Sequence, residues 1–181
     1  MKKPVFWVAA AVLLTIGFMT MYVVAQQVLR QSANDPQSQL AEDAVASLNE
    51  GEKPANVVSG KVDLAASLAP FVIVYDKHGS ALASSGYLDN KIPVVPIGVL
   101  QHASSGRNNV VTWQPAPGVR LATVTAAAND YYVLSGRSLR MVEKRESNVL
   151  HLAALGWVAS LVALGGTFIV QQTKQTKHRR A

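Results

Sequence analysis

Apolar residues fill two long segments of the chain, one near each end. No Asp, Glu, Lys or Arg occurs from Pro4 to Leu29 or from Ser147 to Thr173. At 1.5 Å per helical residue, about 20 residues cross a hydrocarbon core of roughly 30 Å. The pattern therefore predicts two transmembrane helices, over residues 4–25 and 149–170.

The segment between them begins with a helical pattern. Residues 26–54 are predicted to form a stalk helix, interrupted at Asp35-Pro36 because proline lacks a backbone donor and disfavours helix in the residue before it. Gly51-Glu-Lys-Pro54 ends this helix. Residues 55–68 are less regular, and the pattern there allows a short helix near residues 62–68.

Farther along the chain the hydrophobic period changes to two. Five stretches of β-branched and aromatic residues predict strands, with a short helix over 97–103 after the second. The loop Pro115-Ala-Pro-Gly118 closes a hairpin that places Trp113 opposite Arg120. Gly136 marks the end of the last strand, and from about Arg137 the chain is predicted to be helical into the second apolar segment. The strand ranges are 71–75, 80–84, 110–114, 119–125 and 131–135.

Four motifs within this pattern carry a family resemblance. They are Phe71-Val-Ile-Val-Tyr-Asp-Lys-His-Gly79, Thr112-Trp-Gln-Pro115, Gly118-Val-Arg120, and Tyr132-Val-Leu-Ser-Gly-Arg-Ser-Leu139 followed by Val142-Glu143. Together with the flanking apolar segments, they resemble the exported PAS-like sensor region, of the PDC or Cache type, of two-span bacterial membrane receptors. The resemblance covers about residues 26–170. It departs from the family in that no HAMP, kinase, cyclase or methyl-accepting region is found.

The resemblance implies an α+β fold, a PAS-like antiparallel five-stranded sheet with flanking helices between two transmembrane helices. Only about ten residues follow the second apolar segment, which we expect to be too few for an output domain. The expected organisation is a cytoplasmic N-terminus (1–3), transmembrane helix 1 (4–25), an exported stalk helix (26–54), an exported PAS-like domain (55–136), a juxtamembrane helix (137–148), transmembrane helix 2 (149–170) and a basic cytoplasmic tail (171–181).

The charge distribution gives the predicted orientation. The net charge of +6 comes entirely from six basic residues at the two ends, since residues 30–146 hold eleven acidic and eleven basic side chains. Positive charge is retained on the cytoplasmic side, so both termini are expected inside the cell membrane and residues 26–148 outside. A cleaved signal peptide, ending at Val23-Val24-Ala25, is the alternative for the first segment. The basic tail is expected to contact anionic membrane lipid rather than nucleic acid.

Sequence motifs for catalysis and metal binding are missing. The chain has no cysteine, and none of its four histidines has a carboxylate or second histidine at metal-ligand spacing. No nucleophile elbow or phosphate-binding glycine loop occurs. We therefore expect no enzyme activity, no metal and no cofactor.

The resemblance to PAS-like sensors implies a set of ligand-binding candidates on the exported domain. Each has a structural alternative: Trp113 and Arg120 could form a cross-strand cation–π pair, the tyrosines could belong to the core, and Arg137 could cap the following helix. The candidates are Tyr75, His102, Trp113, Arg120, Tyr132 and Arg137.

The second apolar segment carries small residues at a seven-residue repeat. Small side chains let membrane helices approach closely, which indicates packing onto the first span or onto a second copy, with a face toward lipid as the alternative. These residues are Ala153, Gly156, Ser160, Ala163 and Thr167.

Two functions remain after these exclusions. The first is a membrane-anchored extracytoplasmic sensor-like module that binds a small molecule and acts in signal transduction, through a homodimer or a membrane signalling or transport partner. The alternative is a structural or accessory subunit of a membrane complex, with no small-molecule ligand.

Overall fold

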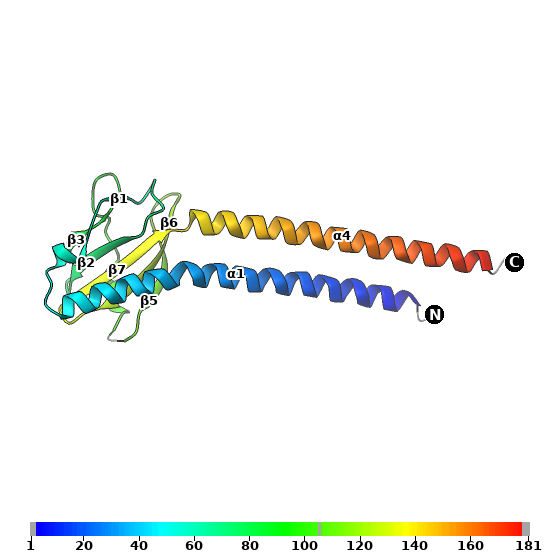
Figure 1. Ribbon diagram of the computed structural model, residues 1–181, viewed down its shortest axis with the longest axis horizontal. Helices are drawn as coiled ribbons and strands as arrows, with labels where there is room; N and C mark the ends of the chain where they lie inside the picture. Colours follow the sequence, from blue (N-terminus) through cyan, green and yellow to red (C-terminus); the bar gives the residue numbers. More distant parts are fainter. Residues whose placement is uncertain (1–2, 105, 179–181) are drawn as a thin grey trace. The chain divides into compact units, whose positions relative to one another are not determined.

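The computed structural model describes residues 3–104 and 106–178 and has two compact units. The helical unit comprises the chain up to Leu29 together with the chain from Lys144, and the sheet unit comprises Arg30–Glu143. The elements in chain order (Figure 1) are α1 (Lys3–Asn49), α2 (Pro54–Val57), β1 (Val62–Asp63), β2 (Phe71–Asp76), β3 (Ala81–Ser84), β4 (Gly86–Tyr87), α3 (Ile97–Gln101), β5 (Asn109–Ala116), β6 (Val119–Ala127), β7 (Tyr131–Ser138) and α4 (Arg140–His178).

The sheet unit is α+β, as predicted. Its main sheet has five antiparallel strands in the order β3-β2-β7-β6-β5. Strand β7, the last strand in the chain, is central and pairs with β2 on one side and with β6 on the other. Strands β1 and β4 form a separate parallel pair. All five predicted strands are present, and the predicted short helix is α3, which is two residues shorter than expected at its C-terminal end.

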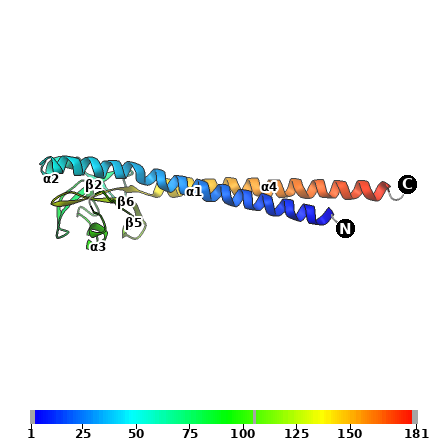
Figure 2. The ribbon, with the colours of Figure 1, turned by 90° about the horizontal axis from the view of Figure 1, so that it is seen from below.

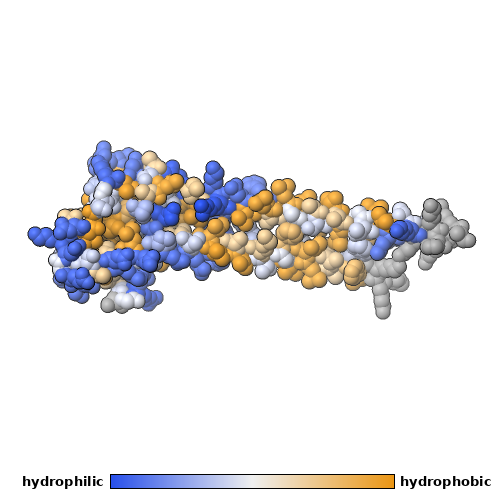
Figure 3. All heavy atoms as spheres, in the orientation of Figure 1, coloured by the Kyte–Doolittle hydropathy of each residue, from blue (hydrophilic) through white to orange (hydrophobic). Residues whose placement is uncertain are grey.

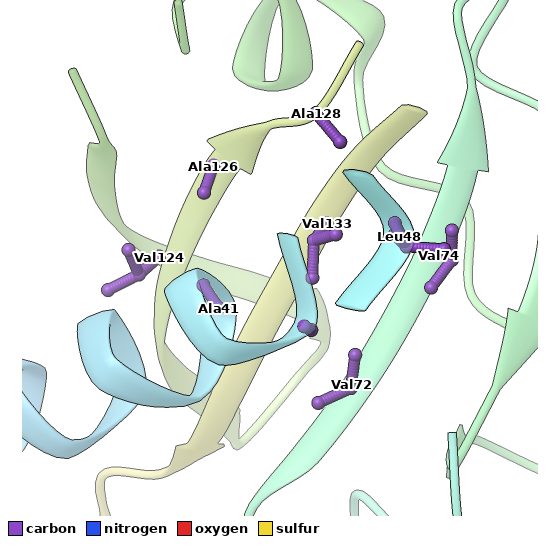
Figure 4. Packing of buried hydrophobic residues seen from close by; sticks show 9 residues of the cluster. Ala41, Leu48, Val72, Val74, Val124, Ala126, Ala128 and Val133 are labelled. Atoms are coloured by element: carbon purple, nitrogen blue, oxygen red, sulfur yellow. The ribbon is translucent and has the colours of Figure 1, made fainter. Parts of the chain in front are cut away.

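Each face of the main sheet has its own covering layer. Figure 2 shows the last part of α1 on one face and α3 on the other. On the α1 face, Ala41, Ala44 and Leu48 pack against side chains of β2, β6 and β7 (Figure 4). On the opposite face, Leu100 of α3 packs into a cluster that contains Phe71 and Trp113. Burial of apolar area on both faces is therefore the main stabilising contribution to this unit.

Helix α1 is continuous where an interruption was expected. Pro36 lies inside the helix, so the predicted break at Asp35-Pro36 is wrong. A proline removes one backbone hydrogen bond and crowds the preceding turn. The turns that follow are held by tertiary burial, because Gln37, Ala41 and Leu48 are all at most 5% exposed on the sheet. The helix ends before Gly51, as predicted.

Two other boundaries differ from the prediction. Residues 62–63 form β1 rather than the start of a helix, because Val62 and Leu64 donate backbone hydrogen bonds to Ser85 and Tyr87. Strand β7 continues to Ser138, so Gly136 lies inside it and α4 begins at Arg140. These two elements depend on contacts with distant parts of the chain, which the local pattern does not contain.

The helical unit contains two helices long and apolar enough to cross a membrane. No residue of their most apolar windows is buried, and large side chains such as Leu13, Leu152 and Val162 are about 70% exposed. Figure 3 shows hydrophobic atoms along this unit. The predicted cytoplasmic ends, 1–3 and 171–181, include residues 1–2 and 179–181, which lie outside the described residues.

Candidate functional site

Three of the six ligand-binding candidates share the sheet face that α3 covers. Tyr75, Trp113 and Tyr132 belong to the same hydrophobic cluster, with Tyr75 directly opposite Tyr132 in neighbouring strands. The Tyr75 side chain is buried, and its hydroxyl makes no hydrogen bond within the part of the chain that the structure describes. Burial raises the pKa of this phenol, so it stays protonated. Tyr132 is half-buried, and the Lys77 ammonium lies 4.4 Å from its ring centroid.

His102 and Arg120 lie outside that cluster. His102 follows α3, is exposed, and its Nδ1 lies 2.5 Å from the Gly98 carbonyl oxygen. Arg120 donates a hydrogen bond to the Glu143 carboxylate in the first turn of α4, and both side chains are partly exposed. Such a pair contributes little to stability in water, about 0–1 kcal/mol. Arg120 is therefore engaged in attaching α4 rather than in a pocket.

The predicted pairing of Trp113 with Arg120 is wrong. Trp113 lies opposite Leu121, because β5 continues through Pro115 and Ala116 and carries a bulge between Trp113 and Ala116. Ala116 pairs with Val119, leaving a two-residue turn in place of the four-residue loop that was expected. A bulge places two residues of one strand against one of the other, which changes the register of everything beyond it.

Arg137 lies on the other face of the sheet. It is opposite Ala122 in β6, and Ala122 is on the same face of the strand as Val124 and Ala126, which pack under α1. The six candidates are thus divided between two faces and the surface, and the structure does not bring them together in one pocket. A ligand role for each of them stays a prediction.

The sheet unit has a polar recess that was not predicted from the sequence. Its volume is about 430 Å³, and it lies beside the β1–β4 pair. The Lys61 ammonium donates to Asn90 Oδ1 at 3.0 Å and lies 5.1 Å from the Tyr87 ring centroid. The recess is lined by Lys61, Asp63, Tyr87, Asp89 and Asn90.

The chemistry of the recess favours a small polar partner with donor groups. The recess is lined by two carboxylates and one ammonium, and that ammonium already donates to Asn90. Asp63 Oδ1 accepts a hydrogen bond from the Ala65 amide at 2.9 Å. Asp89 and Asn90 have positive φ angles of 50° and 62°, a conformation that Asp and Asn adopt more readily than other side chains. Within the described residues there is no group of three or more His, Cys, Asp or Glu side chains that could hold a metal ion.

The sequence contained only part of the signal for this recess. The Asp89-Asn90 dipeptide is typical of a tight turn, and Leu88 and Lys91 exchange both backbone hydrogen bonds around it. The other wall is β1, which pairs with β4 across more than twenty residues. A strand of two residues is too short to show a hydrophobic period, so the sequence does not indicate this pairing.

In the helical unit, the small residues of α4 do not share one contact face. A Cβ atom on Gly156 would lie 2.9 Å from the Phe18 ring, and the Trp157 indole donates to Thr15 Oγ1 at 3.0 Å. Ala153, Gly156 and Ser160 are partly covered, whereas Ala163 and Thr167 are exposed. A straight helix drifts by about 20° every seven residues against a strict 3.5-residue repeat, so the contact face moves to Leu161, Leu164 and Phe168.

Comparison with protein-family models, with curated proteins and with solved structures finds no match to this chain.

Proposed function

We propose that this chain is a membrane-anchored extracytoplasmic sensor module, in which a PAS-like domain of the PDC or Cache type binds a small molecule. The supporting fold feature is the five-stranded antiparallel sheet, with two strands before α3 and three after it. The two exposed apolar helices support the membrane anchor. The basic residues at the chain ends support the orientation with both termini in the cytoplasm.

The observation that carries the proposal is that both apolar helices continue into the elements of the sheet unit. Helix α1 is unbroken from its apolar part to the turns packed on the sheet. Strand β7 and helix α4 are separated by Leu139 alone, whose amide donates to the Arg120 carbonyl at 2.9 Å. A change in the sheet is thereby passed to two helices through short covalent connections.

The first turn of α4 is also fixed to the sheet unit by side chains. The Arg140 guanidinium donates to the Ala66 carbonyl at 2.5 Å, and Arg120 pairs with Glu143. Because these two side-chain contacts and the Leu139 amide hold the start of α4, we expect it to follow movements of the sheet unit rather than to move independently. The proposed output is a change in how the apolar helices contact a membrane partner or a second copy of the chain.

The recess is the proposed ligand site. Its carboxylates and its exposed position suit a small polar molecule that carries an amine or another donor group. Pockets of this kind use a few placed polar groups to fix the orientation of the ligand.

The test is a binding screen on the full chain in lipid nanodiscs. In a W7F/W157F background Trp113 is the remaining tryptophan, and its buried position makes it a reporter of unfolding of the sheet unit. A ligand at 100 times its Kd stabilises by about 2.7 kcal/mol, which raises the unfolding temperature by several degrees. The panel contains small acids, amines and peptides.

A binding ligand should lose its effect in D89N and K61M and keep it in D130N, which carries the same change in a turn outside the recess. If no compound stabilises the protein, the sensor proposal is contradicted and the accessory-subunit alternative is favoured. In that case, proximity labelling from the sheet unit should identify one stoichiometric partner, as expected for a docking subunit.

A further inference from the structure

The main sheet has two outer strands, and their free edges differ in how well they are protected. Strand β3 has four residues, its pairing with β2 is irregular at Val74 and Tyr75, and α2 packs beside it. Short length, irregular pairing and a covering element all prevent an edge strand from pairing with another chain. Strand β5 has eight residues, and residues 109–113 pair regularly with β6. In the described part of the chain no other strand pairs with the outer edge of β5.

Strand β5 also lacks the charged side chains that protect many edge strands. No Asp, Glu, Lys or Arg occurs in residues 108–119. The bulge between Trp113 and Ala116 and the proline at position 115 interrupt the far end of the strand, but residues 109–113 contain neither device. An uncharged, regular edge of this kind readily pairs with another extended chain.

The direction of the backbone groups along this edge follows from one hydrogen bond. The Thr123 hydroxyl donates to the Val111 carbonyl at 2.9 Å, and Thr123 is directly opposite Val111 in β6, so this carbonyl points toward β6. Successive strand residues direct their backbone groups to opposite sides. The N–H and C=O groups of Val110 and Thr112 therefore point away from β6. The side chains of these two residues are exposed, Val110 by 48%.

A second copy in the same membrane does not fit this edge, an argument that rests on the proposed membrane anchor. Asn49 Oδ1 accepts from the Asn129 amide, and the Ser135 hydroxyl donates to the Gln37 carbonyl, so α1 lies along β7. Helix α1 continues without a break into its apolar part. Two anchored copies would therefore present their β5 strands parallel to each other. A two-fold axis between identical parallel strands sets each N–H beside the same N–H, so donors do not face acceptors.

We propose that the outer edge of β5 binds an extended segment of a partner protein, which adds a sixth strand to the main sheet beside residues 109–113. The backbone of that segment exchanges hydrogen bonds with Val110 and Thr112, and its side chains decide which segment binds. Because Val110 is apolar and this part of β5 carries no charge, the segment that fits has β-branched or aromatic residues at alternate positions and no charge at its centre. This surface is separate from the recess and needs no small-molecule ligand.

The experiment is photocrosslinking of the full chain in the cells that naturally produce it. The photoreactive residue benzoylphenylalanine is placed at position 110 or 112 in β5, and at the exposed position 82 in β3 as the control. Crosslinked peptides are then identified by mass spectrometry. We expect positions 110 and 112 to crosslink to one segment of one partner, at residues two apart, because paired strands advance together along the sheet. Position 82 should give no crosslink to that segment.

Two proline variants test whether the contact is made by the backbone. T112P removes an N–H that points away from β6, so it should abolish the crosslink from position 110 and leave the unfolding temperature close to that of the parent. V111P removes an N–H that points toward β6 and should lower the unfolding temperature strongly. If T112P does not fold, T112K replaces it, since a charge on the edge should also weaken the crosslink from position 110, whereas L82K in β3 should leave it unchanged.

The proposal is overturned if positions 110 and 112 give no crosslinked partner, or if they crosslink to unrelated segments or to a second copy of the chain. It is also overturned if the crosslink from position 110 persists in folded T112P, or in T112K where T112P does not fold. Failure of the ligand screen would leave all these outcomes unchanged, so failure of the proposed function and failure of this docking site are distinguishable.

Discussion

Substituting Gly136 by alanine is expected to destabilise the sheet unit strongly. A Cβ atom at this position would lie 2.6 Å from Cζ of Phe71 and 2.9 Å from Cγ2 of Thr123. Both neighbours are fully buried. The Phe71 ring has no room to move away, because the backbone of Gly86 is also close to it. A Cβ atom on Gly86 would lie 2.7 Å from the ring.

The magnitude follows from overpacking. Extra atoms in a well-packed core cost about 1–3 kcal/mol, and the absence of a free direction for Phe71 places G136A in the upper part of that range. For a unit of this size the loss lowers the unfolding temperature by roughly 10 °C. The assay is thermal unfolding followed by Trp113 fluorescence in the W7F/W157F chain. F71L should restore part of the lost stability in the double variant by making room for the new methyl group.

The matched control is G98A, where a Cβ would meet nothing within 4 Å and the residue lies inside α3. Alanine is the better helix former by about 1 kcal/mol, so this variant should be at least as stable as the parent. If G136A unfolds at the same temperature as G98A, the packing of Phe71 between β7 and β4 is wrong.

Three further predictions concern other parts of the chain. G156L should push α4 away from Phe18 and reduce crosslinking between the apolar helices, whereas G165L, at a position with open space, should leave it unchanged. The Ser80 and His78 amides donate to Asp76 and lower the pKa of its carboxyl below the ordinary 3.8. The Asp76 carboxylate therefore stabilises the fold above pH 3.8, and this stabilisation is lost as the pH falls through the lowered pKa. D76N should remove this acid-dependent part of the stability, measured as the unfolding temperature against pH. Burial raises the pKa of the Tyr75 phenol, so the stability of the fold should fall as the pH rises above about 10, where the phenol of the unfolded chain ionises. Y75F should abolish this loss of stability at alkaline pH. Because Y75F also removes a buried hydroxyl that has no hydrogen-bond partner in the described part of the chain, the variant should be at least as stable as the parent at about pH 7.

The elements of the sheet unit were predictable where the signal is local. Strand β2 reads as a continuous β-branched and aromatic run, and the turn after it has Asp76 accepting from two amides and Gly79 at a φ of 85°. The presence of two long apolar helices also follows from the two long runs of residues without charge. These features depend on residues close together in the chain, so the sequence alone indicates them.

The features that were missed depend on distant contacts. Gly136 was interpreted as the end of a strand, but it lies inside β7 because Phe71 needs the space above it. Trp113 was paired with Arg120, but a bulge moved it opposite Leu121. Pro36 was expected to end a helix that packing on the sheet keeps intact. The recess escaped prediction for the same reason, since its walls come from β1 and β4.

The central claim is that the sheet unit lies outside the cell while the chain returns to the cytoplasm after α4. Single cysteines test it in intact cells, at the exposed positions Leu82 in β3 and Gln172 near the end of α4. A membrane-impermeant maleimide should label L82C in intact cells and Q172C only after permeabilisation. Labelling of Q172C but not L82C in intact cells, or of neither before permeabilisation, would contradict the account.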